Sequence, residues 1–114
     1  MLNRRDTYTI AVGSTTTNSI TLNEYSLAAI TTTGSILTAT TLSLLVSHDG
    51  TNFYPLYDRT SEVTISASGV ARSYAIEPTL TYPFQFVKIR EGTSASAVAQ
   101  ATYPVSFVVD YAHL

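Results

Sequence analysis

The side chains best suited to acid–base chemistry are two histidines, and no catalytic set surrounds them in the sequence. His48 lies in a predicted turn, and His113 precedes the final residue. Neither has a serine or a carboxylate at a telling spacing, and no Gly-x-Ser-x-Gly nucleophile motif occurs. A triad assembled in space from distant segments stays open. We expect both histidines to be exposed turn and tail residues.

Eight carboxylates are the other candidates for chemistry, and they are scattered singly: Asp6, Glu24, Asp49, Asp58, Glu62, Glu77, Glu91 and Asp110. Asp58 and Glu62 flank one short turn, and with Asp49 they could offer oxygen ligands to Ca²⁺. No Asp-x-Asp-x-Asp loop supports that site, and turn bonding explains these residues more simply. The absence of cysteine excludes thiolate metal sites and cysteine nucleophiles. We predict a protein that is not an enzyme and has no metal or cofactor.

The elements that must position these residues are β-strands, because apolar and polar residues alternate along the whole chain. Branched and aromatic residues that suit a pleated sheet dominate the composition. The stretch 94–101 is ambiguous between one helical turn and a loop that leads into a short strand. Strands are predicted near residues 7–12, 18–22, 26–32, 36–47, 52–57, 62–67, 70–76, 84–90 and 103–111.

Turn signals between these strands indicate the fold. Asp49-Gly50 predicts a hairpin, and Ser68-Gly69 predicts a second hairpin that joins strands 62–67 and 70–76. Turns recur about every 8–12 residues, which is typical of antiparallel sandwiches and barrels. We predict an all-β, antiparallel two-sheet β-sandwich of about eight strands, jelly-roll-like, although an immunoglobulin-like order also fits. The sandwich is expected to span residues 7–114, after an N-terminal arm of residues 1–6.

The charge balance argues against nucleic acid and membranes as partners. Charged residues make up 12% of the chain, the formal net charge is −2, and threonine and serine supply more than a quarter of all residues. This balance does not support bulk attraction to nucleic acid or to an anionic membrane. The apolar stretches are too short for a membrane helix, and no apolar run follows the basic N-terminus as in a secretory signal.

Basic and aromatic side chains are instead the candidates for contact with a protein partner. Lys88 and Arg90 share one strand face, and the strand 52–57 is apolar or aromatic on both faces. Arginine and aromatic residues are favoured at protein interfaces. The predicted contacts are Arg4, Arg5, Tyr54, Tyr57, Lys88 and Arg90. Alternatively, Tyr54, Tyr57, Tyr74 or Tyr82 could form an exposed platform that stacks on sugar rings.

Two segments carry a resemblance to a known group of proteins. Residues 44–58, LLVSHDGTNFYPLYD, resemble a V-S-x-D-G-x-x-F-x-P-L-Y-D segment. Residues 86–101, FVKIREGTSASAVAQA, are similar to an F-x-K-I-R-x-G-T-S-x-x-x-V-x-Q-A segment. Both belong to small β-sandwich proteins encoded among the head genes of tailed bacteriophages. The resemblance is collinear over about residues 40–110, and the first 35 residues match nothing in that group.

The resemblance implies a capsid decoration, or cement, protein. Such proteins bind the outside of an assembled icosahedral shell, staple neighbouring capsid subunits and have no catalytic residues. The implied partner is the major capsid protein, and the implied location is the capsid exterior of a virion assembled in the host cytoplasm. We expect self-association as a dimer or trimer, with the arm acting as a clamp. The alternative is a carbohydrate- or receptor-binding module of a phage head fibre or tail.

Overall fold

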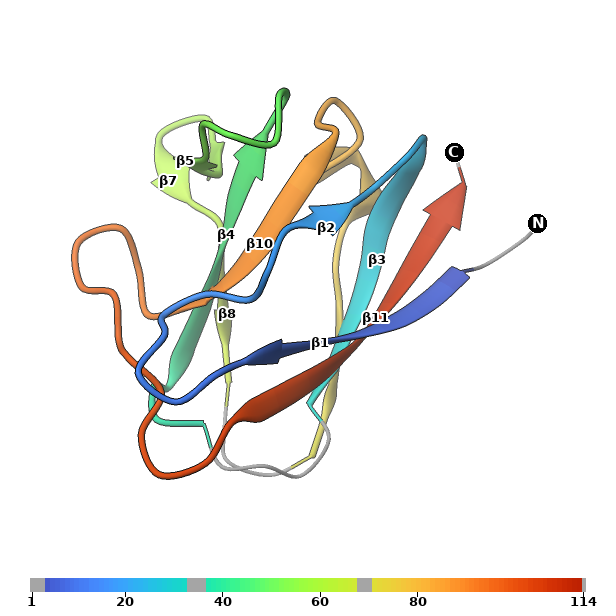
Figure 1. The fold of residues 1–114 in the computed structure, drawn as a ribbon. Helices are drawn as coiled ribbons and strands as arrows, with labels where there is room; N and C mark the ends of the chain where they lie inside the picture. The colour runs from blue at the N-terminus through green and yellow to red at the C-terminus, as the bar shows by residue number, and fades with distance from the viewer. Residues whose placement is uncertain (1–3, 33–36, 68–70, 114) are drawn as a thin grey trace.

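The alternating segments fold into strands in the computed structural model, which describes residues 4–32, 37–67 and 71–113 (Figure 1). A single turn of 3₁₀ helix, Pro78–Leu80, is the one helical element among these residues. The strands are β1 (Arg4–Ile10), β2 (Ile20–Thr21), β3 (Tyr25–Thr32), β4 (Thr41–Ser47), β5 (Tyr54–Pro55), β6 (Tyr57–Asp58), β7 (Ser61–Glu62), β8 (Thr64–Ser66), β9 (Ser73–Ala75), β10 (Phe86–Glu91) and β11 (Val105–His113).

Two antiparallel sheets pack face to face, as the sequence predicts. One sheet has the order β1-β11-β3-β9, and the other has the order β2-β10-β4-β5, with β8 also paired to β4. The chain changes sheet at the connections β1–β2, β2–β3, β3–β4, β8–β9, β9–β10 and β10–β11. The chain therefore passes repeatedly between the two sheets of the sandwich.

The core lies between the two sheets and is made of the inward-facing residues of each strand. Ile89 and Leu44 come from paired central strands of one sheet, and Phe107 and Val109 come from the centre of the other. All four are fully buried. Burial of such side chains contributes roughly 1.5–3 kcal/mol each relative to exposure, so this layer dominates the stability of the fold.

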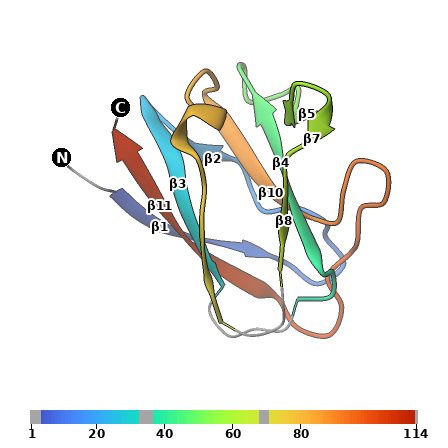
Figure 2. The same ribbon diagram turned by 180° about the vertical axis from the view of Figure 1, so that it is seen from behind.

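Two local predictions differ from the structure, and one stretch that the sequence left ambiguous is decided. Residues 4–6 belong to β1, whose Arg4 pairs with Tyr111, so the predicted arm does not include them; residues 1–3 lie outside the described part. The predicted hairpin at Ser68-Gly69 is wrong, because β8 pairs with β4 whereas β9 pairs with β3 in the other sheet (Figure 2). The stretch 94–101 is a loop, tied to β10 through a bridge between Gly92 and Ala97.

Candidate partner-binding surface

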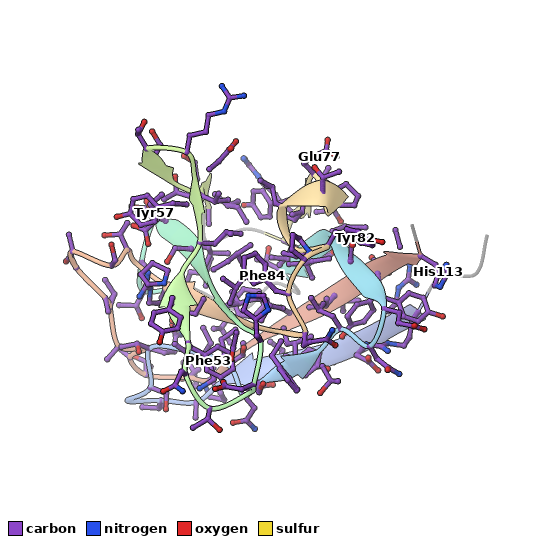
Figure 3. All side chains as sticks on the ribbon, turned by 90° about the horizontal axis from the view of Figure 1, so that it is seen from above. Phe53, Tyr57, Glu77, Tyr82, Phe84 and His113 are labelled. Atoms are coloured by element: carbon purple, nitrogen blue, oxygen red, sulfur yellow. The ribbon has the colours of Figure 1, made fainter. Side chains whose placement is uncertain are left out.

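One end of the sandwich gathers aromatic side chains at its surface (Figure 3). Tyr54, Tyr57 and Tyr82 are 64%, 49% and 59% exposed, whereas Phe53 and Phe84 are half-buried beside them. We call this group of five residues the aromatic end. They come from the segment after β4 and from the segment before β10, which are distant in sequence. Exposed aromatic side chains are enriched at surfaces that bind a protein partner.

The loop after β4 is held in one shape by Asp49. Its carboxylate accepts hydrogen bonds from the backbone N–H groups of Thr51 and Asn52, at 2.9 and 2.8 Å, and from the side chains of Asn52 and Ser47. The two backbone hydrogen bonds are the main reason that the pKa of Asp49 lies far below its usual range. Asp49 therefore stays ionised and fixes the loop that leads into Phe53 and Tyr54.

Side chains of β10 and of the segment before it pack against this loop. The Phe84 ring packs on His48 with 5.1 Å between ring centres, and the Lys88 ammonium lies 4.4 Å from the centre of the Phe53 ring. Phe86 lies under Gly50, where an added Cβ would come within 3.3 Å of its ring. The predicted contact residue Lys88 is thus half-buried and holds Phe53 in place.

A shallow hollow of about 380 Å³ lies beside the aromatic end and is lined by Glu24, Tyr82, Gln85 and His113. Glu24 stands in a tight turn between β2 and β3, where Asn23 and Glu24 have φ of 52° and 72°. Non-glycine residues rarely adopt such φ values. The hollow therefore combines a carboxylate, an amide, an imidazole and an exposed phenol ring, which can both stack on a ligand and hydrogen-bond it.

Arg90, predicted as an exposed contact, is buried instead and stabilises a neighbouring loop. Its guanidinium lies 2.7 Å from the carboxylate of Glu62 and donates a hydrogen bond of 2.9 Å to the Ser43 hydroxyl. Glu62 also accepts hydrogen bonds from the backbone and the hydroxyl of Ser94. The residue lies on the outer face of β10, as the alternation indicates, but Glu62 and the loop after β10 cover it.

Arg4 and Arg5 also have partners within the fold. The Arg4 guanidinium lies 4.0 Å from the ring centre of Tyr111 and 5.0 Å from that of Tyr25, and it donates a 2.6 Å hydrogen bond to the carbonyl of Thr21 in β2. Arg4 therefore ties the two sheets together. Arg5 remains exposed, with an ion pair of 2.6 Å to Asp110 on the neighbouring strand. Exposed pairs of this kind contribute little to stability.

The opposite end of the sandwich carries a buried carboxylate. One oxygen of Glu91 accepts hydrogen bonds from the backbone N–H groups of Thr38 and Ala39, at 3.0 and 3.1 Å, and its other oxygen has no hydrogen-bond partner among the residues that the structure describes. Burial raises the pKa of Glu91, and the two backbone hydrogen bonds only partly oppose that shift. The buried Gln100 accepts from Thr38 as well and completes the attachment of this segment to the sheet.

The candidate catalytic and metal residues stay apart. His48 and His113 are exposed, and Asp58 lies opposite Ser61 in the small sheet of β6 and β7 rather than in a cluster with Asp49. Within residues 4–32, 37–67 and 71–113, no three histidine or acidic side chains lie close enough to hold a metal ion. In the same residues, no helix has the length and apolar character needed to cross a membrane.

Comparisons with known proteins identify a fold relative and no family. No protein-family model matches the chain, and no curated protein matches it. The crystal structure of the SPBc2 prophage-derived protein YomS is similar in fold, with a TM-score of 0.56 and 9% identity, over 98% of this chain and 96% of that one. A chain from the disulfide-linked pili of Bacillus endospore appendages covers 99% of this chain and 88% of its own at 16% identity, but its TM-score of 0.43 carries no argument.

Sequence reasoning found the exposed Tyr54 and Tyr57 but missed the hollow. Tyr82 was predicted only as part of a platform. Glu24, Gln85 and His113 had no signal in common, because the β2–β3 turn, the segment before β10 and the end of β11 bring them together. Tyr74, the other platform candidate, is half-buried on β9. The one local signal was Asn23-Glu24, a polar pair between two strand patterns, which marks a tight turn.

Proposed function

We propose that this chain is a non-enzymatic structural protein of a phage virion, and that it binds the outer surface of an icosahedral capsid and stabilises contacts between capsid subunits. The fold it shares with a prophage-derived protein is compatible with that role. The role requires no catalytic group, metal or cofactor.

The observation that carries the proposal is that the two segments with phage-like motifs lie side by side. In the sheet, β4 and β10 pair from Phe86 and Ser47 to Glu91 and Leu42, so residues 44–58 and 86–101 form one unit. The exposed aromatic residues of that unit, Tyr54 and Tyr57, lie at the aromatic end. Because the two motif segments lie together and carry these exposed tyrosines, we expect the tyrosines to contact the partner.

The aromatic end also has the properties of a rigid contact surface. Tyrosine supplies a large contact area at a small cost in side-chain entropy. The Asp49 hydrogen bonds and the Phe84 and Lys88 contacts fix the loop before binding, which lowers the cost of association. We expect the major capsid protein to contact Tyr54 and Tyr57, with Lys88 positioning Phe53 rather than touching the partner.

Co-sedimentation with empty capsids tests this proposal. Tyr54→Ala with Tyr57→Ala should reduce the capsid-bound fraction at least tenfold, because buried tyrosines are frequent hot spots. Tyr103→Ala is the matched control, since Tyr103 is 70% exposed and precedes β11 at the other end of the sandwich. Equal binding by both variants would contradict the assignment of this surface, and no binding by the unaltered chain would contradict the capsid role.

A second candidate function, glycan binding, is favoured by the hollow. Tyr82 can stack on a sugar ring, while Glu24 and Gln85 can hydrogen-bond its hydroxyl groups. A glycan array separates the two functions. Binding to glycans that is lost in Tyr82→Ala, together with no binding to capsids, would favour a receptor-binding module.

A further inference from the structure

The first strand, β1, is the one long strand at a sheet edge among the described residues. It has seven residues and pairs only with β11. The other edge strands are much shorter: β2 and β5 have two residues each, and β8 and β9 have three each. An edge strand offers a row of backbone N–H and C=O groups to any further strand, and a longer row offers more hydrogen bonds.

The edge of β1 lacks most of the usual protections, since its charged residues are confined to the first three positions, Arg4 to Asp6. Proteins usually block exposed edges with proline, charged side chains (lysine above all), bulges or very short strands. Pro55 lies in β5, but β1 reads RRDTYTI, with no proline, lysine or glycine. Its register with β11 runs without a shift from Arg4 to Ile10. The edge is therefore regular and open to an additional strand.

We propose that two copies of this chain pair through β1, antiparallel, with the two-fold axis beside Thr7. In that register Arg4 lies opposite Ile10 of the second copy, and all seven residues of β1 are paired. A register centred on Arg5 or Asp6 would place like charges opposite each other, which is unfavourable, and would pair fewer residues. The two four-stranded sheets then join as one continuous sheet.

The side chains on the outer face of β1 fit this register. Arg5, Thr7 and Thr9 are exposed there. Thr7 meets Thr7 of the second copy, a favourable cross-strand pair, and Arg5 faces Thr9. The Arg5–Asp110 ion pair lies on the β11 side and need not break. The pairing does not depend on the proposed capsid role; if both hold, antiparallel pairing directs the two aromatic ends outward in opposite directions, so that one dimer can reach two capsid subunits.

Cysteine cross-linking of the purified chain tests the pairing directly, because the chain has no cysteine of its own. Residues opposite each other on antiparallel strands have Cβ atoms about 4.5–5.5 Å apart, close to the separation that a disulfide needs. Thr7→Cys should give a disulfide-linked dimer under mild oxidation. Thr64→Cys, an exposed threonine on the short edge strand β8, is the control and should remain monomeric.

Light scattering of the unaltered chain should give a mass near twice 12.3 kDa at high concentration. Thr7→Lys should raise the dissociation constant of the dimer at least tenfold, whereas Thr64→Lys should leave it unchanged. Circular dichroism should show that both variants are folded. A chain that stays monomeric at millimolar concentration, or equal cross-linking at both cysteines, would overturn the proposal. Protection of β1 from hydrogen exchange only when capsids are added would also overturn it, in favour of a capsid strand as the occupant.

Discussion

Two acidic residues, each followed by glycine, lie at opposite ends of the sandwich and have different structural roles. Asp49-Gly50 lies in the exposed loop after β4, and Glu91-Gly92 lies at the buried end of β10. In both pairs the carboxylate accepts two backbone N–H groups and the glycine has positive φ, 78° and 88°. The local chemistry is the same, but the surroundings differ.

Burial decides what each pair contributes. At Asp49 the hydrogen bonds act on a solvated carboxylate and lower its pKa, whereas at Glu91 the loss of water outweighs similar hydrogen bonds and raises the pKa. Gly50 lies against a flexible Phe86 ring, and Gly92 lies against the backbone of Ser96. The exposed pair shapes a loop, and the buried pair fixes how one segment packs on the sheet.

Replacement of Gly92 should have the largest effect. In Gly92→Ala the added Cβ would overlap the Ser96 carbonyl oxygen, so the loop after β10 must move. We expect a loss of about 3 kcal/mol or more in the free energy of unfolding, measured with urea. Gly13→Ala is the control: Gly13 has φ of 86° but no atom near the added Cβ, so it should lose only about 1–2 kcal/mol.

Removal of the buried carboxylate should come next. Glu91→Ala leaves the N–H of Ala39 without its acceptor and weakens the bonding of Thr38. The free energy of unfolding should fall by about 2–3 kcal/mol. Glu77→Ala, at an exposed position, should change it by less than about 0.5 kcal/mol. Similar losses in the two variants would show that the Glu91 hydrogen bonds carry no net stability.

A methyl group at Gly50 should cost less than one at Gly92. The Cβ in Gly50→Ala meets ring atoms of Phe86 at 3.3 Å, and a ring can shift where backbone cannot. We expect a loss of about 1–2 kcal/mol, mainly from the positive φ. The same variant should bind capsids less well, because the loop carries Phe53 and Tyr54. A loss as large as that of Gly92→Ala would remove the distinction between the two glycines.

The two carboxylates should give the free energy of unfolding opposite pH dependences. We expect this effect to be the smallest of those predicted here. The stability that Asp49 contributes is present above its unfolded pKa of about 4 and is lost as pH falls further. The pKa of Glu91 is raised in the folded chain. The stability that Glu91 contributes is therefore present below its own unfolded pKa and is lost as pH rises through the folded pKa. Unfolding of Asp49→Asn and Glu91→Gln at pH 3, 5 and 7 should show differences from the unaltered chain that change in opposite directions. Parallel changes would refute this assignment.

The sequence predicted the strands well because alternation is a local signal. The long strands β3, β4, β10 and β11 lie within a few residues of their predicted bounds, and the Asp49-Gly50 hairpin joins β4 and β5 as expected. Tyr54 and Tyr57 are exposed, and their role as contact residues stays a prediction. Each of these inferences depended on neighbours within a few positions along the chain.

The errors concern long-range partners. A turn signal at Ser68-Gly69 says that the chain reverses, but not that β8 and β9 join different sheets. Arg4 to Asp6 have weak strand propensity, and pairing with β11 overrides it. Arg90 alternates outward as predicted, yet Glu62, 28 positions away, buries its charge. No periodicity could reveal these partners, because they are set by how the sheets meet.

The position of Arg4 has a mechanical consequence. Because β1 and β11 are antiparallel, the start of one lies beside the end of the other, with Arg4 opposite Tyr111. A force that pulls these two strand ends apart would open the ladder one residue pair at a time, instead of shearing all pairs together. The first pair to open is the one where the Arg4 guanidinium contacts the rings of both Tyr25 and Tyr111 and donates a hydrogen bond to the carbonyl of Thr21. The contacts of Arg4 thus resist separation at the point where the two strands would begin to unzip under tension.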